Sequence, residues 1–158
     1  MILNKKDMED VNLLNINNDL IKIAKTLDTN EKIRNILNFD SNEENSYLNK
    51  QILLKPLIPS SSNGLVIVVL TLAKAIKDNS TNTMSAIINV DILVPYNNYI
   101  NDKYGITPIA IANEVVNIMK DFKQTCGIKY RLYDISNIDF SDLYGGIRLI
   151  YQTTLESL

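Results

Sequence analysis

The chain has 158 residues, 46% of them hydrophobic and 22% charged, with a formal net charge of −2. This length suits one domain, because folding at about 150 residues buries roughly 68–70% of the surface that the unfolded chain exposes. The slightly acidic balance lacks the positive field that neutralises phosphates, so we expect no sequence-specific nucleic-acid binding.

Three further classes are disfavoured by simple features of the sequence. The single cysteine, Cys126, has no internal partner, which excludes a disulfide-stabilised secreted domain. The first ten residues mix acidic and basic side chains and do not resemble a signal peptide. The longest apolar run, at 65–70, is far shorter than the roughly 20 residues that span a bilayer, so we expect no membrane association.

The first forty residues predict a pair of helices. One apolar stripe recurs at spacings of three and four, at Leu13, Ile16, Leu20, Ile23 and Leu27. The sequence Asp-Thr-Asn-Glu at 28–31 resembles a capping box, with Asp28 as the N-cap of a second, short helix.

The middle of the chain predicts three strands separated by polar connections. The polar segments 40–46 and 56–64 are expected to be loops on either side of a short extended run at 51–55. Residues 65–72 are apolar and rich in β-branched side chains, which favours a strand buried on both faces, although a short buried helix has similar periodicity. A polar hairpin connection is expected at 77–83.

Residues 84–94 form the clearest predicted strand. Its wholly apolar face consists of Met84, Ala86, Ile88, Val90, Ile92 and Val94. Pro95 ends this strand, and a loop follows at 96–105. Thr107 is the predicted N-cap of an amphipathic helix, with Pro108 at its first position and Gly127 as its C-terminal cap.

Two alternating segments, 128–133 and 147–152, predict the last strands, with Gly145 and Gly146 in the turn between them. The element order therefore predicts an α+β fold, in which a mostly antiparallel sheet carries a long helix on one face and an N-terminal helical pair. We expect a single domain over 1–158, with N-terminal helices in 1–40 and the sheet and helix core in 47–158.

The residues needed for common catalytic chemistry are missing. The chain has no histidine, the commonest general base and a frequent metal ligand, and it has no Gly-rich phosphate loop or nucleophile elbow. We therefore expect no enzyme activity, no metal site and no cofactor. The acidic pairs at 43–44 and at Asp139 and Asp142 fall in predicted loops, where carboxylates are solvated. Asp91 lies on the polar side of the central strand, and a cross-strand pair with a lysine or arginine is the favoured interpretation.

Tyrosine is the more informative residue type. The chain has eight tyrosines and no tryptophan, and Tyr96, Tyr99 and Tyr104 fall in one loop. Tyrosine is enriched at protein interfaces because it combines a large apolar ring with a polar hydroxyl. These side chains either anchor the loop on its own sheet or contact another subunit.

The sequence at 90–95 (VDILVP), the tyrosine loop and the helix start at 109–115 (IAIANEV) together resemble the tail-terminator and neck proteins of long-tailed bacteriophages. In that family an apolar-Asp-Ile strand ends in proline, an aromatic-bearing loop follows, and a helix begins. The resemblance continues through a strand after Gly127 and a final Gly-apolar-x-apolar-x-Tyr strand at 146–151. Tyr99 lies near the position where the family often has tryptophan, and Ile106 and Thr107 replace a frequent basic residue.

This resemblance implies a structural virion protein that assembles in the host cytoplasm. It implies a homo-oligomeric ring of six subunits that terminates the tail tube and contacts the tail tube protein and the head connector or collar protein. Such a ring needs no cofactor, and it requires contacts between unlike faces of neighbouring subunits. The candidate interface residues are Tyr96, Tyr99, Tyr104, Val66, Val68 and Leu70.

Three alternatives remain open from the sequence. The first is a terminator or collar subunit of a contractile, phage-tail-like bacteriocin. The second is a small non-viral binding module, because α+β folds host many functions. The third is a carboxylate-dependent enzyme that uses Asp91 and the acidic loop pairs.

Overall fold

The computed structural model describes residues 5–38, 50–55, 64–78, 80, 83–123 and 129–156. Within these residues, the helices are α1 (Lys5–Thr29), α2 (Glu31–Leu37) and α3 (Thr107–Asp121), and one 3-10 turn, η3, covers Tyr96–Asn98. The strands are β1 (Ile52–Leu53), β2 (Ile67–Asp78), β3 (Thr83–Pro95), β4 (Ile100–Asn101), β5 (Gly105–Ile106), β6 (Arg131–Asp139) and β7 (Tyr144–Glu156).

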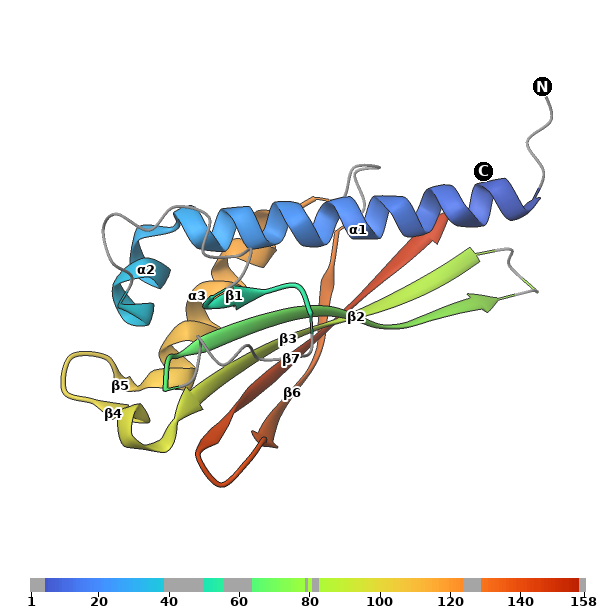
Figure 1. Ribbon diagram of the computed structural model, residues 1–158. Helices are drawn as coiled ribbons and strands as arrows, with labels where there is room; N and C mark the ends of the chain where they lie inside the picture. Colours follow the sequence, from blue (N-terminus) through green and yellow to red (C-terminus); the bar gives the residue numbers. More distant parts are fainter. Residues whose placement is uncertain are drawn as a thin grey trace.

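Five of these strands form one sheet, in the order β1-β2-β3-β7-β6. The pairs β2–β3, β3–β7 and β6–β7 are antiparallel, and β1 runs parallel to β2. A small hairpin, β4–β5, projects beside the start of α3 (Figure 1). The predicted α+β fold with a mostly antiparallel sheet is confirmed.

The helices and one face of the sheet share the main core. Figure 1 shows α1 lying along the sheet, with α2 and α3 toward the end where the β4–β5 hairpin projects. The predicted apolar face of β3 is buried here from Ala86 to Val94, while Met84 packs at its margin. The sheet contacts Ile23 and Leu27 of α1 and Val115 of α3 within this core. Each fully buried aliphatic side chain of this size contributes roughly 1.5–3 kcal/mol to folding.

The junction between α1 and α2 differs from the prediction. The N-cap of α2 is Asn30, whose Oδ1 accepts a hydrogen bond from the Ile33 amide at 3.0 Å. Asp28 remains in the last turn of α1, where it is buried with its Oδ1 3.8 Å from Nη1 of Arg34. Asn30 is the side chain three residues before Ile33, the position that a capping oxygen needs. Leu13 of the predicted stripe is exposed, so the buried stripe begins at Ile16.

The bounds of α3 also differ from the prediction. Its N-cap is Ile106, and the Thr107 hydroxyl donates to the Asn98 carbonyl at 2.8 Å instead of capping the helix. The helix ends at Asp121 because Phe122 adopts an extended backbone and its ring lies 5.9 Å from that of Tyr130. The predicted cap Gly127, together with Cys126, lies outside the described residues, as do the predicted loop 40–46 and residues 56–63.

The predicted glycine turn is part of a strand. Gly145 and Gly146 lie inside β7, opposite Val94 and Leu93 of β3, and the connection from β6 to β7 is at 140–143. A Cβ atom on Gly146 would lie 1.7 Å from the carbonyl oxygen of Ile92, so this position requires glycine. Gly146 therefore allows β3 and β7 to approach closely, Gly145 makes room for the Tyr96 ring, and neither forms a turn.

Candidate functional site

Three surface hollows gather at one end of the sheet, where β3 ends and β7 begins. We call this region the loop end. It consists of residues 96–107, residues 139–144 around the β6–β7 connection, the C-terminus of α2 and residues 64–66. All three tyrosines of the predicted interface loop belong to it.

Tyr96 joins the tyrosine loop to the start of β7. Its amide donates to the carbonyl of Leu143 at 3.0 Å, and its hydroxyl donates to Oδ1 of Asp139 at 3.2 Å. Its ring covers Gly145, where an added Cβ would lie 2.8 Å from a ring carbon. Burial raises the pKa of Tyr96, and the hydrogen bond to Asp139 adds to that increase. The ring nevertheless stays 46% exposed, so it is both anchored and accessible.

The other two tyrosines lie in different parts of the loop end. Tyr99 packs against the main core, with its ring centroid 5.9 Å from that of Tyr96. Its carbonyl accepts a hydrogen bond from the Thr107 amide at 2.9 Å, which ties the loop to the first residue of α3. Tyr104 is half-buried and lines the largest hollow of the loop end. Tyr96 and Tyr99 therefore act as loop anchors, and part of Tyr96 remains available for contact.

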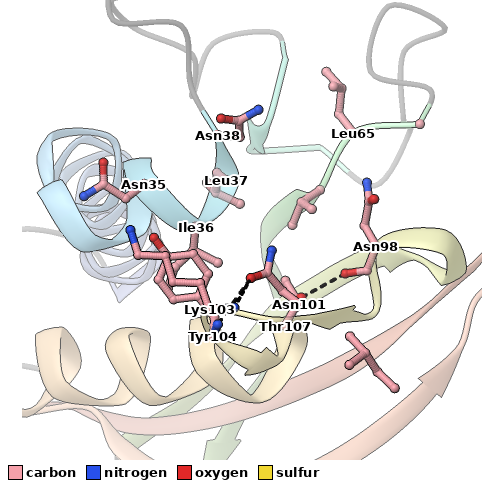
Figure 2. Close-up of a pocket in the computed structure, with 13 residues that line it drawn as sticks. Asn35, Ile36, Leu37, Asn38, Leu65, Asn98, Asn101, Lys103, Tyr104 and Thr107 are labelled. Carbon is pink, nitrogen blue, oxygen red and sulfur yellow. Dashed lines mark hydrogen bonds between the residues drawn. The ribbon is translucent and has the colours of Figure 1, made fainter.

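The largest of these three hollows is a pocket of about 530 Å³ between α2, the start of β2 and the tyrosine loop (Figure 2). We call it the amide pocket, because four asparagines line it: Asn35, Asn38, Asn98 and Asn101. Its volume falls within the range of roughly 300–1,000 Å³ that is usual for binding pockets. Among the residues that line it, Lys103 is the charged one and lies beside Tyr104, with its ammonium 5.2 Å from the ring centroid.

Local hydrogen bonds shape one wall of the amide pocket. Oδ1 of Asn101 accepts hydrogen bonds from the amides of Lys103 at 2.8 Å and Tyr104 at 3.3 Å, which closes an Asx turn (Figure 2). Asn38, on the opposite wall, has a left-handed backbone with φ 55°, a conformation that asparagine tolerates better than most residues. These local features place the lining side chains without a ligand.

The connection between β6 and β7 is equally well ordered by hydrogen bonds, and we call residues 139–143 the acidic turn. Oγ of Ser141 accepts from the amides of Leu143 and Tyr144, both at 3.2 Å, and the Ser141 amide donates to the Tyr144 carbonyl at 3.2 Å. The Tyr144 hydroxyl donates to the carbonyl of Leu65 at 3.0 Å. All five residues of the turn are exposed, including two carboxylates, Asp139 and Asp142.

The predicted interface residues in and just before β2 are placed differently from expectation. Val66, Val68 and Leu70 are 7%, 1% and 0% exposed and belong to the core beneath the helices. Their side chains pack within this chain and are not offered to a neighbouring subunit. The continuous apolar run at 66–70 is explained by burial on both faces, because Ile67 and Val69 join a smaller cluster on the other side of the sheet.

Sequence reasoning missed three exposed aliphatic residues of the loop end. Ile100 and Ile106 are 77% and 46% exposed on the β4–β5 hairpin, and Leu143 is 66% exposed at the acidic turn. Each is an isolated apolar residue within a polar, turn-rich segment, and this isolation could have identified it from the sequence. Such residues bury little in the folded chain and are therefore free to bury surface against a partner.

Asp91 forms the predicted cross-strand pair. Nε and Nη2 of Arg148, directly opposite on β7, donate to its two carboxylate oxygens at 2.7 and 2.8 Å. The hydrogen bond to Asp91 raises the pKa of Arg148. Since both oxygens of Asp91 are engaged, this carboxylate serves the sheet and lies on a different surface from the amide pocket.

Two other properties concern the described part of the chain as a whole. It contains no group of three or more histidine, cysteine, aspartate or glutamate side chains that could hold a metal ion. None of the helices described is long and apolar enough to cross a membrane. The site is thus defined by its amides, tyrosines, exposed aliphatic residues and the charges around them.

A scan against protein-family models finds no match for this chain, and a search of curated proteins finds none either.

Proposed function

We propose that this chain is a structural, non-enzymatic subunit of a bacteriophage neck, which forms a ring that terminates the tail tube and joins it to the head connector. The observation that carries the proposal is the loop end. The residues that resemble tail-terminator and neck proteins, 90–95 and 109–115, are the end of β3 and the start of α3, which together hold this surface in place.

The chemistry of the loop end supports contact better than catalysis. Exposed apolar side chains such as Ile100 and Leu143 lie beside polar groups and charges, the mixture found in protein interfaces. Among the described residues that line the amide pocket, Lys103 and Tyr104 carry ionisable groups, and none is a carboxylate, histidine or cysteine that could act as their acid–base partner. Asp91 is held by Arg148, which leaves the carboxylate-enzyme hypothesis without its best candidate.

Electron microscopy combined with a mass measurement tests this proposal. The purified chain is expected to form closed rings of six subunits and to cap tail tubes when mixed with tubes assembled from the tail tube protein. Light scattering coupled to size exclusion gives the subunit number. A chain that stays monomeric at every concentration and never associates with tubes or connectors would refute the proposal.

Two related roles are separated by further observations. A terminator of a contractile bacteriocin would form the same ring, and the neighbouring genes would encode a sheath and baseplate without a head. A small-molecule binding module is favoured by one feature, the amide pocket of about 530 Å³. A binding module would show a large thermal shift with a polar ligand and would not assemble with tubes.

A further inference from the structure

The loop end carries two unlike surfaces whose chemistry is complementary. We propose that the acidic turn (residues 139–143) of one copy docks into the amide pocket of the next copy, so that successive subunits join through a heterologous contact. This inference rests on the proposed ring, and it names the surfaces that would build it.

The charges of the two surfaces are opposite. The acidic turn presents Asp139 and Asp142, both on exposed residues, whereas Lys103 supplies the charge of the amide pocket. No salt bridge of Lys103 or Asp142 occurs within the described residues, and both residues are exposed. Complementary charges of this kind direct encounter and fix the register of an interface.

The uncharged parts also match. Phe140 and Leu143 flank the turn, and both are exposed, while Ile100 lies at the rim of the pocket and is 77% exposed. Docking would remove these apolar side chains from water. The asparagines carry both donors and acceptors, which suits them to pair with the backbone of an exposed turn.

Both surfaces are ordered before they meet. Ser141 holds the turn through two accepted hydrogen bonds, and Tyr96 fixes Asp139 at its base. Asn101 fixes Lys103 and Tyr104 through the Asx turn. A contact between preorganised surfaces loses little conformational entropy on binding.

The contact is between copies, not within one chain. The acidic turn lies beside Pro95, Tyr96 and Asn97 in two smaller hollows, and none of its residues lines the amide pocket. In the head-to-tail contact proposed here, each copy uses its turn toward one neighbour and its pocket toward the other. Such contacts continue into a closed ring or an open filament, whereas a two-fold dimer would pair both surfaces reciprocally.

Charge reversal tests this docking directly in the full chain. Lys103→Glu and Asp142→Lys should each weaken self-association at least tenfold in sedimentation velocity. An equimolar mixture of the two variants should recover association, because the intact turn of the first meets the intact pocket of the second. Lys120→Glu and Asp121→Lys, on exposed residues at the end of α3, make the same changes in net charge and should associate like the wild type.

The outcomes separate this inference from the proposed function. If the wild type forms rings and both reversals assemble as it does, the docking surfaces are wrong and the ring stands. If each reversal weakens assembly but the mixture recovers nothing, the two sites do not meet and the docking is also overturned. A monomeric wild type would overturn the docking together with the ring. Circular dichroism melting of each variant confirms that it is folded.

Discussion

Arg148 and Asp91 face each other across β7 and β3, and the guanidinium donates two hydrogen bonds to the carboxylate, at 2.7 and 2.8 Å. Their side chains are 40% and 16% exposed, so solvent screens the pair only in part. A bidentate pair of this kind fixes the register of the two central strands, because sliding by one residue would separate the charges.

Replacing Asp91 with Asn is expected to lower the free energy of unfolding by about 1 kcal/mol, after allowance for solvent screening. The melting temperature should fall by about 2–4 °C in a chain of this size, as measured by circular dichroism. Arg148→Lys keeps the charge but loses the two-point geometry, so a similar loss is expected. An Asp91→Asn variant as stable as the wild type would show that the pair does not stabilise the sheet.

Removing the hydroxyl of Tyr151 is expected to preserve or raise stability, in contrast to the loss expected at Asp91. Its buried hydroxyl has no hydrogen-bond partner among the described residues. An unsatisfied buried hydroxyl costs roughly 1–3 kcal/mol, so Tyr151→Phe should preserve or increase stability. Tyr130→Phe is the matched control, because the Tyr130 hydroxyl donates to Oδ2 of buried Asp19 at 2.9 Å and its loss should destabilise the fold. Denaturant unfolding of both variants checks the contrast.

The same tyrosine predicts how stability changes at alkaline pH. Burial raises the pKa of Tyr151 from 10.0 to about 12. Between these values the unfolded chain loses the proton while the folded chain keeps it, so the stability contribution is complete below pH 10 and falls as pH rises toward 12. Tyr151→Phe should lose less stability than the wild type over this range, as followed by urea unfolding at a series of pH values. If stability fell equally steeply with pH in both proteins, the pKa of Tyr151 would be the same in the folded and unfolded chain.

Gly146 and Gly145 should respond differently to alanine. At Gly146 the new methyl group would collide with the Ile92 backbone, and we expect destabilisation of about 3 kcal/mol or more, in the range of severe packing defects. At Gly145 it would meet the ring of Tyr96, which is half-exposed and can move, so a smaller loss is expected. Adding Tyr96→Ala should relieve the clash in Gly145→Ala but not in Gly146→Ala, as a double-mutant cycle of unfolding energies would reveal.

One substitution in the core and one on the surface should separate effects on stability from effects on assembly. Leu70→Ala removes a fully buried side chain and should cost about 2–5 kcal/mol of stability. Ile100→Ser alters a side chain that is 77% exposed, so it should leave the melting temperature nearly unchanged while weakening self-association. Parallel melting and sedimentation measurements test both. Unchanged assembly in Ile100→Ser would remove the β4–β5 hairpin from the interface.

Local periodicity predicted much of the fold. The alternation at 84–94 and the helical stripe from Ile16 to Leu27 both encode which face is buried, since side-chain direction follows from backbone geometry alone. The same reasoning placed Asp91 on the face where it meets Arg148. The predicted cap Asp28 was wrong, because Asp28 belongs to the last turn of α1 and Asn30 stands three residues before Ile33, whose amide it caps.

The tertiary structure decided which groups meet. Gly145 and Gly146 have the composition of a turn, yet the pairing of β3 with β7 placed them inside a strand. The apolar run of β2 could equally have served a core or an interface, and the helices packed over it made it core. Lys103 and Asp142 are 39 positions apart by number, and the sheet register brings their segments to the same end of the molecule. By itself, the sequence determined the faces of its strands and helices, because those depend on neighbours along the chain. The loop end arose only from contacts between distant segments, whose geometry no local pattern encodes.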